Sequence, residues 1–316
     1  MTAVTPLCTM FARDPWGVTC FVSGASAPAD IRGLSRFRVP LGVSLAELSD
    51  AGVAELLAAA RIPLQRVFVD SGAFSEVEIQ RGRPVVSRPI DDATWRQRLA
   101  VTLRIAAAFG ERAVVVAPDC VGNQAETLAR LTRYRSEVQA IAATGARVVL
   151  PLQRGAMVLA NFEPAAADAA GLENYAVGIT GNKDATPPAE LESYLRASKP
   201  RAAHLLGVGP RSRRLQPLLD TFRRLSPKTE ITTDANLLAA LVGRSNGRGG
   251  APRSLTAWQD HYDTEGSEKA REDAVAMVFG PSRMLWLTMD EMVRRGRMSP
   301  PRERPLQRGL FDGVGG

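Results

Sequence analysis

Cysteine and histidine are scarce in this chain, which has three cysteines and two histidines among 316 residues. The cysteines Cys8, Cys20 and Cys120 are scattered, so they cannot form the Cys-x-x-Cys pairs of a zinc knuckle. The sequence therefore predicts no metal site. It also predicts reduced thiols, as in a cytoplasmic protein.

Long apolar runs are absent as well. No stretch approaches the roughly 18 consecutive apolar residues that span a bilayer. The first residues also lack the charged region and apolar core of a secretion signal. We therefore expect a cytoplasmic protein with no membrane partner. Aromatic residues make up 6% of the chain and hydrophobic residues 45%, which predicts a globular fold with an aliphatic core.

Acidic residues are outnumbered by basic ones. The chain has 40 Lys and Arg against 33 Asp and Glu, a formal net charge of +7. This excess supplies a sequence-independent attraction to phosphate groups, as in proteins that bind nucleic acids. An arginine-rich composition that reflects a high-GC genome gives the same excess, so the charge alone does not identify a partner.

Short apolar segments alternate with amphipathic helical patterns over most of the chain. Segments typical of buried parallel strands cover residues 17–23, 37–43, 66–70, 113–119, 147–153, 175–180, 202–208 and 230–234. Helical patterns cover residues 44–60, 93–109, 125–143, 188–198 and 213–225. Eight such units predict an α/β fold, a (β/α)8 TIM barrel. A doubly wound sheet is the alternative, but no Gly-x-Gly-x-x-Gly follows the first strand.

The regular alternation fades after Asp234. We predict a TIM-barrel domain over residues 1–265, with a glycine- and arginine-rich loop at 243–253. Closing C-terminal helices are expected over 266–293, and no zinc subdomain is expected. The remaining residues, 294–316, are rich in Pro, Arg and Gly, which predicts a flexible basic tail.

Polar side chains occupy the carboxyl ends of four predicted strands. They are Asp70, Asp119, Gln153 and Asp234. In TIM barrels this face carries the active site. An aspartate at a strand end is also a common helix N-cap, so each position alone has an ordinary structural explanation. Four such residues on one rim favour a functional site.

Glycine turns accompany these residues. Asp70 begins the segment Asp-Ser-Gly-Ala-Phe, and the strand at 202–208 continues into His-Leu-Leu-Gly-Val-Gly at 204–209. Gly178 and Gly181 flank the end of the preceding strand. Glycines at these positions allow the backbone to approach a ligand closely. Phe74 would offer an aromatic face to a flat ligand.

In order and spacing, the segments between Val67 and Gly250 resemble the tRNA-guanine transglycosylase superfamily. Asp-Ser-Gly-Ala-Phe is similar to the family's acid/base motif, and the segment at 204–209 is similar to its Leu-Met-Gly-Val-Gly run. Thr232-Thr233-Asp234 matches the position of the nucleophile motif. The family's zinc cluster has no counterpart here. The resemblance is therefore closest to the zinc-free branch that inserts deazapurines into DNA.

The resemblance implies a role for each matching residue. Asp70 would be the acid/base and Asp234 the nucleophile. The implied base-binding residues are Ser71, Phe74, Asp119, Gln153, Gly178, Ile179 and Leu206. Arginines in loops after barrel strands are expected to hold the nucleic-acid backbone: Arg211, Arg213, Arg214, Arg244 and Arg248.

The implied function is a pentosyltransferase, a DNA guanine transglycosylase that exchanges guanine in DNA for a free 7-deazaguanine such as preQ0. One carboxylate would form a covalent glycosyl-aspartate while the other carries the proton. The expected partners are DNA, with tRNA as the alternative, the free base, and proteins of a DNA-modification system. No cofactor is expected. Three other hypotheses stay open: a zinc-free enzyme acting on tRNA, an inactive barrel that binds nucleic acid or a base, and an unrelated hydrolase or aldolase whose rim carboxylates serve a metal.

Overall fold

The computed structural model describes residues 18–236, except 37, 81–82, 182–184 and 210–211. Eight parallel strands close into a barrel in the order β1-β10-β9-β8-β7-β6-β3-β2. Their bounds are β1 (Thr19–Ser23), β2 (Leu41–Ser44), β3 (Val67–Asp70), β6 (Ala113–Val116), β7 (Arg147–Pro151), β8 (Ala176–Thr180), β9 (Ala202–Leu206) and β10 (Glu230–Ala235). The predicted (β/α)8 TIM barrel is confirmed. The predicted closing helices and tail lie outside the described residues.

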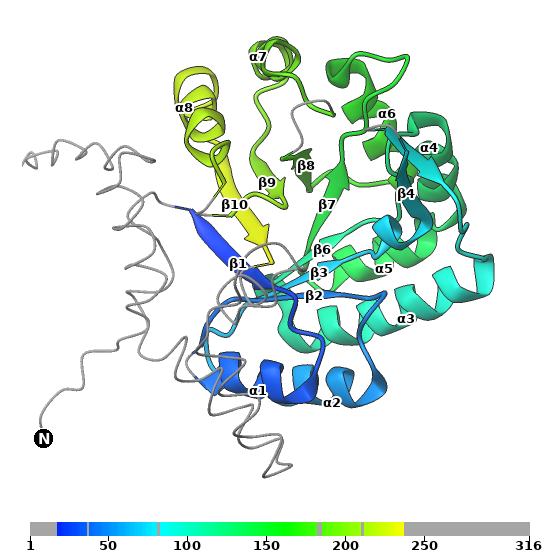
Figure 1. Ribbon diagram of the computed structural model, residues 1–316, viewed down its shortest axis with the longest axis vertical. Coiled ribbons are helices and arrows are strands. Elements are labelled where there is room, and N and C mark those ends of the chain that lie inside the picture. The colour runs from blue at the N-terminus through cyan, green and yellow to red at the C-terminus, as the bar shows by residue number, and fades with distance from the viewer. Residues whose placement is uncertain (1–17, 37, 81–82, 182–184, 210–211, 237–316) are drawn as a thin grey trace, which may run out of the picture.

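Helices surround the strands on the outer side of the barrel (Figure 1). They are α1 (Pro28–Arg36), α2 (Asp50–Ala59), α3 (Asp92–Phe109), α4 (Gln124–Arg133), α5 (Arg135–Ala143), α6 (Leu159–Ala170), α7 (Pro188–Ala197) and α8 (Leu215–Leu225). The pattern predicted at 125–143 is two helices that meet at Tyr134. Helices α1 and α6 were not predicted, and α6 contains the helix-disfavouring Pro164. Among the described helices, none is both long and apolar enough to cross a membrane.

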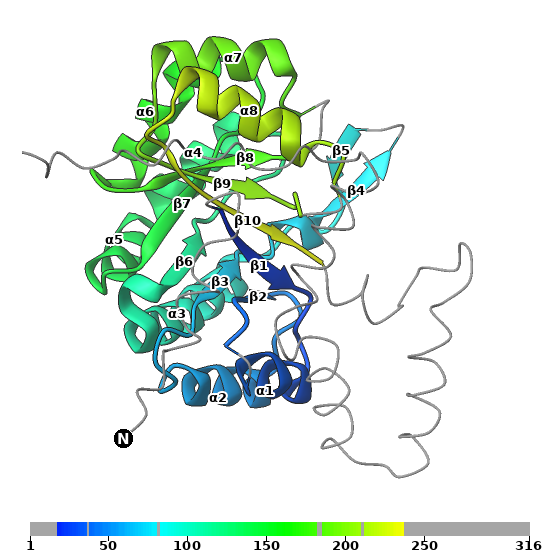
Figure 2. The same ribbon diagram turned by 90° about the vertical axis from the view of Figure 1, so that its left-hand side faces the viewer.

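A two-stranded hairpin follows β3 and was not predicted either. A short 3-10 helix, η2 (Ala73–Glu76), leads into antiparallel β4 (Val77–Gln80) and β5 (Arg83–Val86). A second 3-10 helix, η3 (Gly110–Arg112), precedes β6. The hairpin lies at the end of the barrel toward which the strand arrows point (Figure 2). It therefore stands beside the face where TIM barrels carry their sites.

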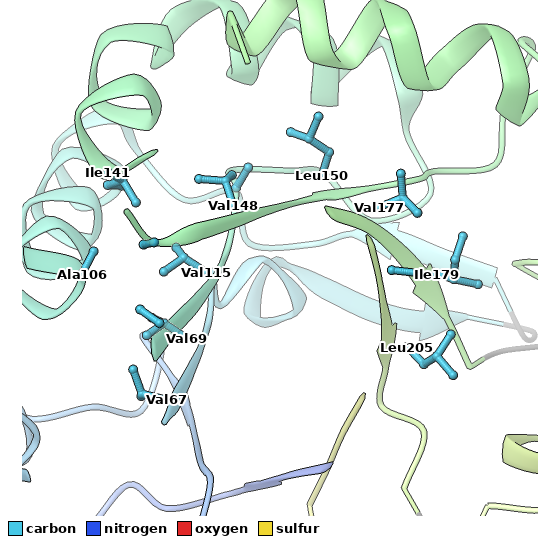
Figure 3. Packing of buried hydrophobic residues seen from close by; sticks show 14 of the residues in the cluster. Val67, Val69, Ala106, Val115, Ile141, Val148, Leu150, Val177, Ile179 and Leu205 are labelled. Carbon is cyan, nitrogen blue, oxygen red and sulfur yellow. The ribbon is translucent and has the colours of Figure 1, made fainter. Parts of the chain in front are cut away.

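Alternation along the strands separates two buried clusters, because successive side chains point to opposite faces of a strand. The inner cluster fills the barrel and comprises Phe21, Phe68, Val114, Val116, Val149, Ala176 and Ala202. The outer cluster packs strands against helices and includes Val67, Val69, Val115, Val148, Leu150, Val177, Ile179 and Leu205 (Figure 3). Asp70 lies two residues after Phe68, so its side chain belongs to the inner face.

Charged side chains gather at the amino end of the barrel. Arg66 donates to Thr19 Oγ1 at 2.9 Å and lies over the ring of Phe21, 5.7 Å from its centroid. Arg147 forms an ion pair with Glu230 at 2.8 Å. These strand-start residues pair with one another. The aspartates described next belong to the opposite end.

Candidate active site

Four neighbouring strands place polar side chains together at the carboxyl end of the barrel. Strands β1, β2 and β3 end at Ser23, Ser44 and Asp70, and Asp234 lies one residue before the end of β10. The strand order β10-β1-β2-β3 makes these ends adjacent, and Ser44 is the direct register partner of Asp70. Two aspartates more than 160 positions apart in the sequence thus share one site.

Asp234 is surrounded by hydrogen-bond donors. Its Oδ2 accepts from Ser23 Oγ at 2.8 Å, and its Oδ1 accepts from the backbone N–H of Gly207 at 2.7 Å. His204 Nε2 lies 3.3 Å from the same Oδ1. Burial alone would raise the pKa of Asp234, but His204, Gly207 and Ser23 together hold it below its usual value. Asp234 is therefore an ionised carboxylate.

Gly42 on β2 makes room for this arrangement. A Cβ atom at Gly42 would lie 2.3 Å from Ser23 Oγ and 2.8 Å from Ser23 Cα. Contacts this short do not occur, so a larger residue would displace Ser23. The missing side chain on β2 allows the Ser23 hydroxyl to reach Asp234.

His204 connects Asp234 to the barrel interior. Its side chain is fully buried, and its Nδ1 lies 2.8 Å from Thr232 Oγ1. The imidazole stacks on the ring of Phe68 with centroids 4.3 Å apart and an interplanar angle of 9°. Both ring nitrogens thus have partners.

Asp70 has the opposite electrostatic character. Its Oδ2 accepts from Ser44 Oγ and from the backbone N–H of Gly72, each at 3.2 Å. Burial is the largest cause that raises the pKa of Asp70, and the negative charge of Asp234 adds to it. Among the described residues, nothing hydrogen-bonds to Oδ1 of Asp70. This half-buried carboxyl group is therefore harder to ionise than an ordinary aspartate, and one of its oxygens is open to a ligand.

Arg98 on α3 stabilises the turn after Asp70. Gly72 has a φ of 74°, in the left-handed region that favours glycine. Arg98 on α3 donates to the carbonyl oxygens of Ser71 and Gly72, at 3.3 and 3.2 Å. These bonds hold the backbone N–H of Gly72 toward Asp70.

Asp119 lies in the loop after β6 because that strand ends at Val116, earlier than predicted. Its Oδ1 accepts from Ser71 Oγ at 3.1 Å, and its Oδ2 accepts from Gln153 Nε2 at 2.8 Å. Burial, followed by the charge of Asp70, raises the pKa of Asp119 to about 7. A carboxyl group with this pKa changes charge near neutral pH.

Gln153 is occupied at both ends of its amide. While Nε2 donates to Asp119, Oε1 accepts from the backbone N–H of Gly122 at 2.8 Å. Arg130 adds a bond to the Asp119 carbonyl oxygen at 2.7 Å and pairs with the buried Glu76. The carboxylate and amide that were expected to read a purine thus satisfy each other.

The remaining predicted base-binding residues occupy different environments. Phe74 in η2 is 60% exposed, and Leu206 packs partly against the inner cluster. The carbonyl oxygen of Gly178 accepts from the backbone N–H of Leu152 at 2.9 Å. The Ile179 side chain belongs to the outer cluster and points away from the site (Figure 3).

The predicted backbone-binding arginines are not a single group. Arg214 donates to the carbonyl oxygens of Gly181 and Thr186, at 2.7 and 3.2 Å, and so ties two loops together. Arg213 is exposed. Arg211, Arg244 and Arg248 lie outside the described residues. Contact between these arginines and nucleic acid stays a prediction.

Three residues of the site were missed from the sequence: Ser23, Ser44 and His204. Ser23 ends the first predicted strand, so the rule that selected Asp70 would have found it. Ser44 lies one residue beyond the predicted strand at 37–43, because β2 extends to Ser44. His204 lies two residues before the end of β9, on the inward-facing positions. Because side chains alternate between the two faces of a strand, this spacing could have identified His204 as an inward-facing residue.

Neither a cluster of metal-binding side chains nor a strand lysine occurs in the part of the chain that the structure describes. Its His, Cys, Asp and Glu side chains form no group of three or more that could hold a metal ion. None of the described strands contains a lysine.

Comparisons with known proteins identify no family for this chain. No family model and no curated protein matches it. Its fold is similar to N-acetylneuraminate lyase from Mycoplasma synoviae, with 10% identity, a TM-score of 0.44 and coverage of 92% of each chain. D-psicose 3-epimerase gives 13% identity and a TM-score of 0.43 over 84% of this chain and 98% of that one. A Coccidioides immitis protein assigned as a fructose-1,6-biphosphate aldolase has 13% identity and a TM-score of 0.44, over 90% of this chain and 96% of that one.

These findings correct the expected family and function. The similar barrels are a lyase, an epimerase and an assigned aldolase, and no guanine transglycosylase is among these neighbours. The predictions of superfamily membership, of a DNA guanine transglycosylase using preQ0, and of a pentosyltransferase are therefore wrong. The segments behind the resemblance, at 70–74 and 204–209, are glycine turns at strand ends. Such turns serve the geometry of a parallel barrel and do not by themselves define a family.

Proposed function

We propose that this chain is an enzyme that moves protons on a small hydroxylated carbonyl compound, as an isomerase or a lyase does. One observation supports the proposal: two carboxyl groups at one end of the barrel have pKa values displaced in opposite directions. Burial and Asp234 raise the pKa of Asp70, whereas donors lower the pKa of Asp234 against the effect of burial. Neighbouring groups whose pKa values are pushed apart are typical of a catalytic acid and base.

Each carboxyl group has a defined task in this reaction. Asp234 accepts the proton from the carbon next to the carbonyl group. The electron pair of that C–H bond forms a C=C bond, and the carbonyl oxygen takes the proton of Asp70. The product of this step on a hydroxylated carbonyl compound is an enediol. Asp234 then returns its proton to the former carbonyl carbon, while the neighbouring hydroxyl group gives its proton to Asp70 and becomes the new carbonyl group, which completes an isomerisation. The free Oδ1 of Asp70 is the position from which the proton of Asp70 leaves.

The donors around Asp234 explain why a carbonyl substrate is required. A carboxylate that accepts three hydrogen bonds is a weak base, so it removes a proton only from an acidified carbon. Donation from Asp70 to the carbonyl oxygen supplies that acidity. Once Asp234 is protonated, its charge no longer raises the pKa of Asp70, and Asp70 becomes the better donor.

The described residues support acid–base catalysis by the two carboxyl groups better than catalysis through a Schiff base. An aldol cleavage through a covalent amine adduct needs a lysine amine in the site. The described strands carry none, whereas they supply both carboxyl groups. We also propose the cytoplasm as the compartment, because three scattered cysteines are typical of a protein with reduced thiols.

Hydrogen–deuterium exchange tests the proposal directly. The protein is incubated in D2O with a panel of ketoses, aldoses and 2-oxo acids, and loss of the C–H signal next to the carbonyl group is followed by proton NMR. We expect exchange with at least one compound. We expect Asp70→Asn and Asp234→Asn each to slow it about 100-fold or more. Asp220→Asn, which changes an exposed carboxylate on α8, is the matched control and should leave the rate unchanged.

The pH dependence provides a second measure. The rate should fall on the acidic side as Asp234 gains a proton and on the alkaline side as Asp70 loses one. Absence of exchange across the panel with folded protein would overturn the proposal. Exchange at the unmodified rate in both aspartate variants would also overturn it.

A further inference from the structure

His204 is an exception inside the barrel. The inner cluster around it is apolar, and the imidazole is fully buried against Phe68, with Phe21 at a centroid distance of 6.2 Å. Burying a polar ring costs free energy unless its nitrogens are hydrogen-bonded. A leucine or phenylalanine would pack at this position without that cost. The structure thus retains a polar ring where packing alone does not require one.

The two nitrogens of this ring join residues of one strand. Nδ1 lies 2.8 Å from Thr232 Oγ1, and Nε2 lies 3.3 Å from Asp234 Oδ1. Thr232 and Asp234 are alternate residues of β10, so both face the barrel interior. If the Thr232 hydroxyl donates to Nδ1, the proton of the neutral ring is on Nε2 and points at Asp234. The chain Thr232–His204–Asp234 thus orients one donor toward the carboxylate.

We propose that His204 is a positioning residue that keeps Asp234 ionised and fixes its orientation, with Thr232 selecting the ring tautomer. The inference rests on the proposed function in giving Asp234 the role of base. The contacts that carry it are independent of any substrate.

The surroundings of Asp234 leave few other groups that could do this. Asp70, on β3, is the other carboxyl group coupled to this pair, and the charge of Asp234 raises the pKa of Asp70. Ser23 from β1 and the Gly207 N–H after β9 are neutral donors. Removing the imidazole donor should therefore make Asp234 harder to ionise.

Labelled histidine makes the tautomer measurable because the chain has only two histidines. In 15N-histidine protein, the His204→Gln spectrum identifies the His204 signals. We expect Nε2 to carry the proton at neutral pH and Nδ1 to be unprotonated. In Thr232→Val, the Nδ1 signal should shift because its partner is lost.

The pKa of Asp234 is the decisive readout, and no substrate is needed for it. In 13C-aspartate protein, with the Asp234→Asn spectrum as assignment, we expect His204→Phe to raise this pKa by about one unit or more. His204→Gln retains an amide donor and should raise it less. The acidic limb of the exchange profile should move to higher pH by the same amount.

A control on the same strand separates positioning from stability. Thr233 is buried on β10 but faces the outer side, where its hydroxyl lies within hydrogen-bond reach of the carbonyl oxygens of Leu205 and Val208. Thr233→Val should lower stability and leave the pKa of Asp234 unchanged. If His204→Phe, or His204→Gln where the former does not fold, lowers stability but leaves that pKa unchanged, the proposal is wrong. A shifted pKa in a protein that exchanges no substrate would keep this inference and overturn only the proposed function.

Discussion

At the scale of single residues, the site depends on carboxyl groups whose protonation differs although they share one rim. Asp119 offers the clearest stability test because burial raises its pKa to about 7. The unfolded chain releases this proton near pH 4. Asp119 therefore makes its full contribution to the free energy of unfolding below about pH 4. This contribution decreases as the pH rises through 7.

Asp119→Asn should remove that dependence. Between pH 5 and pH 8 the unmodified protein should lose roughly 2 kcal/mol more stability than the variant, as measured by urea unfolding at both pH values. Asp220→Asn, on the exposed side of α8, should follow the unmodified protein. Parallel pH curves for Asp119→Asn and the unmodified chain would show that Asp119 ionises as easily in the folded state as in the unfolded one.

The rim aspartates were predictable, whereas their partners were not. Asp70 ends a segment that is apolar on both faces, and Asp234 ends the last predicted strand segment, so both positions could be located without tertiary information. The Ser23–Asp234 hydrogen bond joins residues 211 positions apart, and no local pattern encodes it. The same limit applies to Gln153, whose amide turns toward Asp119 instead of outward.

At the scale of elements, the fit between β1 and β2 decides where Ser23 points. Gly42 faces Ser23 in the parallel register, and an added Cβ would meet its hydroxyl oxygen. Gly42→Ala should therefore destabilise the protein by about 1–3 kcal/mol and push Ser23 away from Asp234.

A double-mutant cycle tests that cause. In a Ser23→Ala background the hydroxyl is gone, so Gly42→Ala should cost less in urea unfolding than in the unmodified chain. Part of the cost should persist, because the Ser23 Cα also lies only 2.8 Å from the added Cβ. Equal costs in the two backgrounds would mean that the hydroxyl is not the obstacle.

Elements with a clear burial pattern were predictable from the sequence, and elements without one were not. Strands such as β3 and β6 consist largely of apolar residues, and α3 and α8 show a clear helical period. The hairpin β4–β5 has exposed residues such as Val85 and Val86, so it leaves no burial pattern to read. Helix α6 contains an internal proline, which disfavours a helix in the sequence, and in the fold it packs against α4 and α7.

At the scale of the whole molecule, β10 closes the barrel between β9 and β1. Its backbone groups bond to both neighbours, so a proline within it removes a ladder hydrogen bond on one side. Ile231→Pro should abolish the cooperative unfolding transition and the near-ultraviolet circular dichroism of the packed core. Val85→Pro, in the hairpin outside the barrel, should preserve both. A cooperative transition in Ile231→Pro would mean that the barrel tolerates an open seam.

The barrel architecture could be predicted from the repeated alternation of strand and helix patterns, although helices α1 and α6 were missed. The chemistry could not be predicted in this way. Eight β–α units specify the fold through burial and period alone. The reaction depends on the distances between strand ends that only closure of the ring creates. The glycine turns at 70–74 and 204–209 fit this architecture, and for that reason they resembled motifs of a family that the comparisons contradict.

The single unoccupied oxygen of Asp70 has a stereochemical consequence. Ser44 and the Gly72 N–H hold the other oxygen, so the carboxyl group can approach a bound molecule from one direction only. Asp234 lies across β1 and β2 from it and is equally fixed. In the proposed reaction Asp70 acts on an oxygen atom, so a planar intermediate would receive its carbon-bound proton on the one face that meets Asp234. The handedness of the product would then be set by the wall of the barrel and not by the substrate.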